Sequence, residues 1–364
     1  WEVLKYADLT TRAEIFGFFD EANQREIVEQ SDRREIGQLI AALPPDDRVD
    51  LLKEIEPTVV AELLPLIPVD ERRDILRLRA YPESTAGALM TTEFAKLGEQ
   101  APVGEALEEL GRQAENLETI YYLYVVDDED HLRGVVSTRQ LVSSLGKPEV
   151  TMGDLMERDV VTVDVLDDQE ATAEKVARYD LLAIPVVDEE HHLLGIITHD
   201  DVIDVVREEA TEDVHRLAAV DPLETSYSRT HWFTLARKRG VWLVILFLSS
   251  LFTALALKAY KGDLSEIAWL VLFIPLVIST GGNSGSQSAT LVIRALTVGD
   301  VQTGDWVPVM LRELLIGLCL GTFLGLIGFG AVFLIEWSAD PRQALIVPVT
   351  LILVVLWGTL AGTL

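Results

Sequence analysis

Long apolar runs after residue 240 constrain this chain more than any other feature. They are Val241–Leu257, Ile267–Ser279, Leu314–Ile335 and Leu345–Leu364. Alone or with adjoining small residues, they are long enough to cross the ~30 Å hydrocarbon core of a bilayer. Most charged residues lie before them, so the two halves of the chain require different solvents. We therefore expect an all-α transmembrane domain at residues 229–364, embedded in a lipid bilayer, behind a water-exposed first half.

The charge of the chain limits its partners. Asp and Glu number 59 against 30 Lys and Arg, a formal net charge of −29. Such a charge repels nucleic acid phosphates and attracts cations, so we expect no nucleic acid partner. The single cysteine, Cys319, lies in an apolar run and excludes a disulfide framework.

The basic cluster Arg237, Lys238 and Arg239 directly precedes the first apolar run. By the positive-inside rule, it places the acidic half in the cytoplasm of a multi-pass protein of the cell (inner) membrane. The chain starts at Trp1 and stops at Leu364 within an apolar run, so we expect the sequence to be partial.

Residues 1–88 predict an α-helical domain. Apolar residues recur at three- and four-residue spacing, as in Ile36, Leu39, Ile40 and Leu43. Prolines separate such segments, with aspartates placed to cap the helices that follow. This repetition predicts a small helical superhelix.

A second repeat follows. Val125–Ser137 matches Val186–Thr198 at a constant offset, and Leu89-Met90 and Leu155-Met156 open the two copies. Each copy predicts a β-α-β-β-α unit in which a polar turn ends in glycine. The units, at residues 89–148 and 149–204, resemble a tandem CBS module, which implies a sensor of adenine nucleotides or ions.

The polar run Pro275–Thr290, preceded by the CBS-like pair and the helical domain, resembles the MgtE family of magnesium channels and transporters. The resemblance implies a homodimer with five spans per subunit, of which four are present here. It implies Mg²⁺ uptake gated by cytosolic Mg²⁺. The aspartate that serves the family's ion path lies in the fifth span and has no counterpart here.

The polar run is the candidate ion path. A hydrated Mg²⁺ ion suits carbonyl, amide and hydroxyl oxygens, which the candidates Ser279, Gly281, Gly282, Asn283, Ser284 and Ser286 offer. The alternative is that these small residues let helices pack closely. No carboxylate lies near the middle of an apolar run, since Glu313 and Glu336 sit near ends.

A connecting helix and linker at residues 205–228 carries the like-charge pairs Glu208/Glu212 and Glu209/Asp213 at i,i+4 spacing. These pairs fit either of two interpretations. The helix has a solvated acidic face, or cations bridge the carboxylates and relieve their repulsion. The resemblance implies a "plug" helix and regulatory Mg²⁺ sites. We expect Asp46 and Asp50 to face Asp201, and a second cluster to join Glu170, Asp180, Asp204, Glu209, Glu212 and Asp213. Glu26 is a weaker candidate.

Nucleotide binding is a competing use of the CBS-like pair. The family pattern Gly-x-x-Thr/Ser-x-x-Asp survives in the second copy as Gly195, Thr198 and Asp201. In the first copy, Gln140 replaces the acid, which argues against ATP there, although Tyr122, Ser137 and Arg139 remain as base and phosphate contacts.

Rival functions remain open on the residues alone. Oxygen ligands suit Mn²⁺ and Co²⁺ as well as Mg²⁺, and a membrane-anchored nucleotide sensor without transport is a further alternative. A membrane metalloprotease would need a His-Glu-x-x-His motif. The sequence contains none, and all six histidines precede the apolar runs. We therefore expect a transporter and no enzymatic activity.

Overall fold

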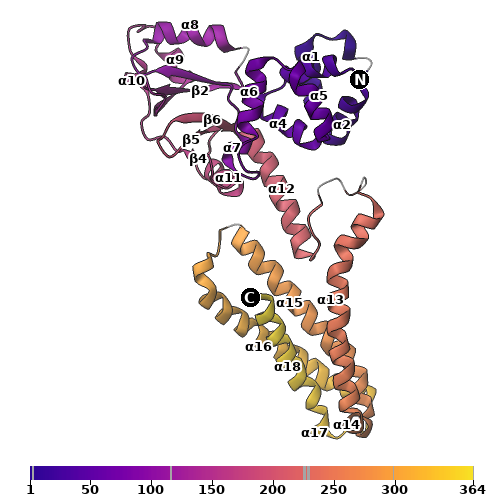
Figure 1. The fold of residues 1–364 in the computed structure, drawn as a ribbon. Helices are drawn as coiled ribbons and strands as arrows, with labels where there is room; N and C mark the ends of the chain where they lie inside the picture. Colours follow the sequence, from indigo (N-terminus) through magenta and orange to yellow (C-terminus); the bar gives the residue numbers. More distant parts are fainter. Residues whose placement is uncertain (2–3, 115–116, 224–226, 228–229, 298, 364) are drawn as a thin grey trace. The chain divides into compact units, whose positions relative to one another are not determined.

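The computed structural model describes residues 1, 4–114, 117–223, 227, 230–297 and 299–363 (Figure 1). It divides into two compact units, Trp1–Ala210 and Thr211–Leu364. The predicted linker at 205–228 and the last residue, Leu364, fall partly or wholly outside the described residues.

The first unit begins with short helices around a shared apolar core. These are η1 (Leu4–Tyr6), α1 (Leu9–Gly17), α2 (Glu21–Gln30), α3 (Arg33–Ala41), α4 (Pro45–Glu54), α5 (Pro57–Leu63), η2 (Leu64–Leu66) and α6 (Val69–Leu78). Ile36, Leu39 and Ile40 of α3 are buried, so the helical domain expected from their spacing is confirmed.

The aspartates after the prolines do not cap the helices as expected. Pro44 itself occupies the N-cap of α4, and Asp46 lies in the first helical turn. Proline suits a helix start because the first N–H groups of a helix lack partners within it. Aspartate side chains do cap other helices: Asp8, Asp20 and Asp32 accept hydrogen bonds at the starts of α1, α2 and α3.

Two three-stranded sheets confirm the β-α-β-β-α repeat. The first copy contains β1 (Phe94–Gly98), α8 (Val103–Gln113), β2 (Thr119–Val126), β3 (Leu132–Ser137) and α9 (Thr138–Ser143). The second contains β4 (Val163–Asp164), α11 (Gln169–Arg178), β5 (Ala183–Val187), β6 (Leu193–Thr198) and α12 (His199–Leu217). In both sheets the first strand pairs in parallel with the second, and the second pairs antiparallel with the third.

The opening segment of each copy packs on the sheet of the other copy. After α7 (Ala86–Leu89), Thr91 exchanges backbone hydrogen bonds of 2.8 and 3.0 Å with Ile196 of β6. After α10 (Met152–Leu155), Glu157 exchanges bonds of 2.9 and 3.0 Å with Val135 of β3. The two copies are therefore joined by reciprocal exchange.

This exchange explains the repeated glycines, which we predicted at the ends of the polar turns. Gly134 and Gly195 lie inside β3 and β6. A Cβ on Gly134 would lie 2.6 Å from Sδ of Met156, and one on Gly195 would lie 2.7 Å from Sδ of Met90. Only a residue without a side chain lets the exchanged segment approach so closely.

Within its described residues, the second unit contains four helices long and apolar enough to cross a membrane, as expected. They span Trp232–Ala259, Ala268–Thr297, Trp306–Ile335 and Pro341–Thr363. Its elements are α13 (Trp232–Ala259), α14 (Lys261–Glu266), η4 (Ala268–Phe273), α15 (Ile274–Thr297), η5 (Thr303–Asp305), α16 (Trp306–Ile335), α17 (Pro341–Ala344) and α18 (Ile346–Thr363).

Helix α18 packs against both α15 and α16 through glycines (Figure 1). A Cβ on Gly358 would lie 2.5 Å from the carbonyl oxygen of Gly281, and one on Gly321 would lie 2.9 Å from Cα of Ile352. Small residues allow such close approach of helices inside membranes.

Candidate metal site and ion path

Carboxylates from three separate segments of the first unit interact with one another. Asp46 and Asp47 lie in the first turn of α4, Asp200 and Asp201 lie in the first turn of α12, and Glu118 directly precedes β2. The charges that raise the pKa of Asp46 include those of Asp201, Asp47 and Glu118. We call these five residues the acidic site.

Asp46 is the innermost member of the acidic site. Its side chain is only 8% exposed, and its Oδ1 atom is buried without a hydrogen-bond partner. Burial, and then the neighbouring carboxylates, raise the pKa of Asp46 well above its usual value. The nearby guanidinium of Arg48 does not compensate Asp46, because its Nη2 atom lies 3.0 Å from Oε1 of Glu93.

The pKa values of two further members are also raised. Burial and the charges of Asp201 and Asp200 raise the pKa of Glu118 to about 7. Burial raises the pKa of Asp201 to about 6, although the hydroxyl of Thr198 donates a 2.6 Å hydrogen bond to its Oδ2 atom. Partial desolvation and the charges of Asp50 and Asp200 raise the pKa of Asp47.

The donor set and its electrostatics fit a hard divalent cation. Mg²⁺ prefers carboxylate oxygens and keeps several of its waters. An orphaned carboxylate oxygen among like charges is costly to bury, and a bound cation would supply the missing partner. The carboxylates of the acidic site therefore offer the type of ligand that Mg²⁺ prefers.

The sequence prediction for this site was incomplete. The structure brings together the predicted residues Asp46 and Asp201. The predicted Asp50 is more exposed, and its Oδ1 atom lies 2.8 Å from Nζ of Lys53. Glu118 was missed, because nothing in its local sequence distinguishes it from other glutamates at the end of a loop. Glu26, on α2, accepts a hydrogen bond from Gln30 of the same helix.

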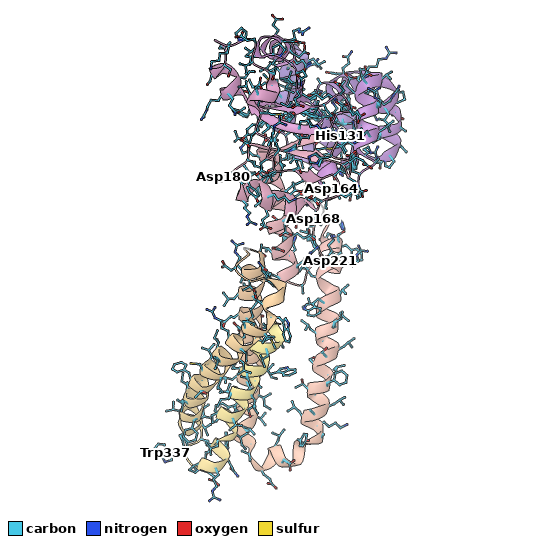
Figure 2. The ribbon with its side chains drawn as sticks, turned by 90° about the vertical axis from the view of Figure 1, so that its left-hand side faces the viewer. His131, Asp164, Asp168, Asp180, Asp221 and Trp337 are labelled. Atoms are coloured by element: carbon cyan, nitrogen blue, oxygen red, sulfur yellow. The ribbon has the colours of Figure 1, made fainter. Side chains whose placement is uncertain are left out.

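The residues of the second predicted cluster are divided between the two units. Glu170 lies in the first turn of α11. Asp180, labelled in Figure 2, follows the other end of this helix, ~15 Å away at 1.5 Å per residue. Glu209 accepts a 2.7 Å hydrogen bond from Gln169, while Asp204 pairs with Arg207. Glu212 and Asp213 belong to the second unit, where Glu212 pairs with Arg216 and Asp213 accepts a hydrogen bond from Thr297.

The polar run of the second unit forms a continuous helix, α15, with two different faces. Gly281 and Ser284 are buried, and Gly281 lies against Val354 and Gly358 of α18. The other predicted ion-path residues, Ser279, Gly282, Asn283 and Ser286, are exposed in the single chain. Their three- and four-residue spacing places them on one face. Close helix packing thus explains the small residues of the buried face, and the exposed polar face is the candidate for the ion path.

Glu313 is a buried carboxylate in the membrane unit that sequence reasoning set aside as near an end. It lies on α16 and is 8% exposed. The hydroxyl of Ser288 on α15 lies 2.8 Å from Oε2 of Glu313 and 3.0 Å from the hydroxyl of Thr363 on α18. This polar cluster joins all three helices.

The candidate nucleotide residues of the first CBS copy lie close together. Tyr122 of β2 pairs across the strands with Ser137 of β3, and the exposed Arg139 follows on α9. However, the hydroxyl of Ser137 already donates a 2.7 Å hydrogen bond to Oε1 of Gln140. In the second copy, the hydroxyl of Thr198 likewise donates a hydrogen bond to Oδ2 of Asp201, at the start of α12.

Comparison with known families covers most of the chain. Residues 1–84 match the MgtE intracellular N domain, residues 86–147 and 152–208 match CBS domains, and residues 274–364 match MgtE, a divalent cation transporter model. Together with the four apolar helices, these matches define a membrane protein with a CBS-containing soluble region. The chain belongs to the MgtE family.

Individual relatives agree with this assignment. The chain is 42% identical over 287 residues to the magnesium transporter MgtE of Thermus thermophilus, covering 79% of this chain and 63% of the relative. It is 37% identical to that of Enterococcus faecalis, covering 80% and 62%. The chain thus spans less than two thirds of the length of these relatives.

Two solved structures resemble the soluble region. The crystal structure of the soluble part of a magnesium transporter is 37% identical, with a TM-score of 0.55, over 57% of this chain and 81% of that one. The cytosolic domain of the Mg²⁺ channel MgtE in complex with ATP is 35% identical, with a TM-score of 0.54, over 56% and 83%.

Proposed function

We propose that this protein is a Mg²⁺ channel or transporter for magnesium uptake, which closes when cytosolic Mg²⁺ binds at the acidic site. The observation that carries the regulatory part is the buried, unpartnered Oδ1 atom of Asp46 among other carboxylates. Magnesium as the cargo is supported by the relatives, which are named magnesium transporters.

The acidic site couples ion binding to the arrangement of the soluble region. Asp46 belongs to the helical domain, whereas Glu118 and Asp201 belong to the first and second CBS copies. Without a cation, mutual repulsion of the carboxylates favours separation of these segments. A bound Mg²⁺ ion would hold them together, and because α12 leaves the site directly, its position would depend on the ion. The carboxylates that remain dispersed in a single chain, including Glu170, Asp180 and Asp204, would add ions only on contact with other subunits or domains.

The ion path is assigned to the polar face of α15. Its amide and hydroxyl groups, from Ser279, Asn283 and Ser286, can bind the water shell of a Mg²⁺ ion without removing it. An exposed polar face inside a bilayer requires a partner or water. We assign that role to a second copy of the chain, so that two α15 helices line the path of a homodimer in the inner membrane, with the soluble region in the cytoplasm.

ATP is a secondary ligand in this proposal. The structure of the MgtE cytosolic domain holding ATP supports a nucleotide at the CBS pair, but Gln140 occupies the hydroxyl of Ser137 here. Calorimetric titration of the protein with ATP, with and without Mg²⁺, measures this affinity. We assign no enzymatic role to the chain.

Reconstitution tests the function. Protein in liposomes should conduct Mg²⁺ when free Mg²⁺ on the side of the soluble region is low and should close at millimolar levels. Closure should coincide with protection of the soluble region from protease. Flux of an anion in place of Mg²⁺ would refute Mg²⁺ as the transported ion. Protease protection that does not change with Mg²⁺ concentration would refute gating by Mg²⁺. Competition by Mn²⁺ and Co²⁺ measures selectivity among the alternatives.

A further inference from the structure

The tips of the two central hairpins carry the same constellation of side chains. Asp127, Glu129 and His131 follow β2 in the pattern Asp-x-Glu-x-His, and Asp188, Glu190 and His192 follow β5 in the same pattern. Neither set contributes a residue to the acidic site or to the predicted nucleotide contacts. The repeat therefore places two potential metal-ligand sets at one end of the CBS pair.

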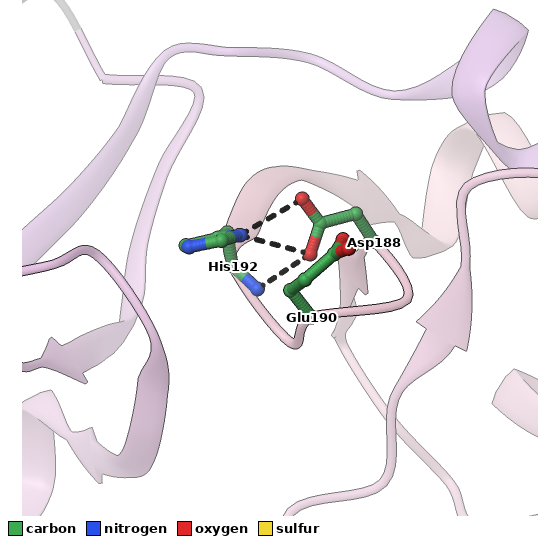
Figure 3. A group of neighbouring side chains, drawn as sticks. All are labelled: Asp188, Glu190 and His192. Carbon is green, nitrogen blue, oxygen red and sulfur yellow. Dashed lines mark hydrogen bonds and ion pairs between the residues drawn. The ribbon is translucent and has the colours of Figure 1, made fainter.

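The second set is gathered closely enough to share one ion. Asp188, Glu190 and His192 each offer a ligand atom within 4.8 Å of the others (Figure 3). The Nδ1 atom of His192 lies 3.1 and 2.9 Å from the two carboxylate oxygens of Asp188. In a tetrahedral site with ligand bonds of ~2.1 Å, ligand atoms are separated by ~3.4 Å, so small side-chain rotations suffice.

The ring and the carboxylate are held in place by further contacts. The backbone N–H of His192 donates a 2.8 Å hydrogen bond to Oδ1 of Asp188. The imidazole of His192 stacks on that of His131, with ring centroids 4.4 Å apart. Leu132 and Leu193 donate 3.0 Å backbone bonds across the two tips, to His191 and Asp130. Such support orients a ligand before an ion arrives.

The first set differs at one decisive position. Arg133 places its guanidinium against Asp127, with Nε 3.0 Å and Nη2 2.6 Å from Oδ2. The equivalent residue in the second set is Leu194, which brings no charge. A guanidinium is thus already present beside Asp127, whereas among the described residues the only basic side chain that pairs with Asp188 is His192.

We propose that Asp188, Glu190 and His192 form a binding site for a divalent transition-metal ion of the Zn²⁺ class. An imidazole nitrogen beside two carboxylates favours such ions over Mg²⁺, which prefers oxygen ligands alone. With three protein ligands, the partly exposed site leaves a position for water. Arg133 prevents the first set from binding an ion in the same way.

The test is Zn²⁺ binding to the full chain in detergent, measured by calorimetry and by competition with a chromophoric Zn²⁺ indicator, under saturating Mg²⁺. Mg²⁺ in excess fills oxygen-only sites, so the result does not depend on the proposed transport function. Glu190→Gln should weaken one Zn²⁺ site by at least about tenfold, since even partners outside the ligand shell contribute that much. The matched variant Glu129→Gln, at the same place in the first set, should bind like the unaltered protein.

Exchanging Arg133 and Leu194, the seventh residues of the two sets, completes the test. Leu194→Arg should weaken the site as Glu190→Gln does, and Arg133→Leu should add a second Zn²⁺ per chain. Arg133 is half-exposed, whereas Leu194 is partly buried against the core of the first unit, so a thermal melt verifies folding of each variant. Equal Zn²⁺ binding by the unaltered protein, Glu190→Gln and Leu194→Arg would overturn the proposal. Failure of Arg133→Leu to bind a second ion would overturn the role given to the guanidinium.

Discussion

The hydroxyl of Ser288 on α15 donates a 2.8 Å hydrogen bond to Oε2 of Glu313 on α16, within the packed part of the membrane unit. Ionisable residues buried at membrane depth are rare and need such partners. Ser288→Ala would leave the carboxylate with one partner fewer, and we expect a loss of about 1–3 kcal/mol in stability. Thermal unfolding in detergent measures the loss. Thr290→Ala, which removes an exposed hydroxyl bonded only within its own helix, is the control, and equal melting of both variants would contradict the role of Ser288.

Glycine packing between α15 and α18 gives a second prediction. Gly358→Ala places a Cβ 2.5 Å from the carbonyl oxygen of Gly281, so the helices must separate. We expect a destabilisation of about 1–3 kcal/mol, as for other overpacked positions. Gly330→Ala on α16 meets nothing within 4 Å and should be neutral or slightly stabilising. Unfolding of the two variants in the same detergent distinguishes them.

The two faces of α15 should differ in transport. Asn283→Ala removes an amide from the exposed polar face, and we expect Mg²⁺ flux into liposomes to fall several-fold. Ser284→Ala, one residue along, removes a buried hydroxyl that has no hydrogen-bond partner. It should leave flux unchanged and raise stability slightly. The reverse order of effects would show that the path does not follow the exposed face.

If Mg²⁺ binds at the acidic site, replacing one of its carboxylates should weaken the closure of the soluble region by Mg²⁺. Glu118→Gln removes one charge, and we expect the Mg²⁺ concentration for half-maximal protease protection to rise on the order of tenfold, because ligand charge tunes affinity. Glu26→Gln, on the exposed face of α2, is the matched control. An unchanged midpoint in Glu118→Gln would exclude this residue from the site.

Stability should fall as pH rises when Mg²⁺ is absent. The folded pKa of Glu118 is about 7 against an ordinary value of 4.5, and that of Asp201 is about 6 against 3.8. Between these limits the folded chain holds more protons than the unfolded chain, so the stability gained by protonation is lost as pH rises through the folded pKa values. In a chelator, the melting temperature should therefore decrease from weakly acidic to weakly basic pH.

Millimolar Mg²⁺ should flatten this dependence, since the ion takes over the role of the protons and competes with them. The double variant Asp46→Asn, Glu118→Gln should show a weaker pH dependence in chelator than the unaltered chain. A melting temperature that rises with pH in chelator would contradict the pKa shifts on which the prediction rests.

The parts of this fold that depend on local pattern could be predicted from sequence. The spacing of Ile36, Leu39 and Ile40, the matching hairpins and the apolar runs report on faces and lengths that each segment must have in any packing. The structure confirms the helical domain, the paired β-α-β-β-α units and four membrane-length helices.

The parts that depend on distant contacts could not. Glu118 joins Asp46 and Asp201 only because three segments separated by many residues converge, and an isolated glutamate carries no signal of this. Glu313 was judged from its position near the end of an apolar run, and that position does not reveal the neighbours that α15 and α18 supply. The sequence does not distinguish the two faces of α15, because the contact of Gly281 with Val354 of α18 is made by a distant segment.

The crossed attachment of Met90 beneath Gly195 and of Met156 beneath Gly134 bears on how such a module is inherited. A single copy excised from the gene would carry a segment with no sheet of its own to cover and a sheet with an open glycine groove. It could fold only by borrowing the missing piece from another molecule. A substitution at Met90 or Met156 therefore alters the packing of the copy other than the one in which that methionine lies.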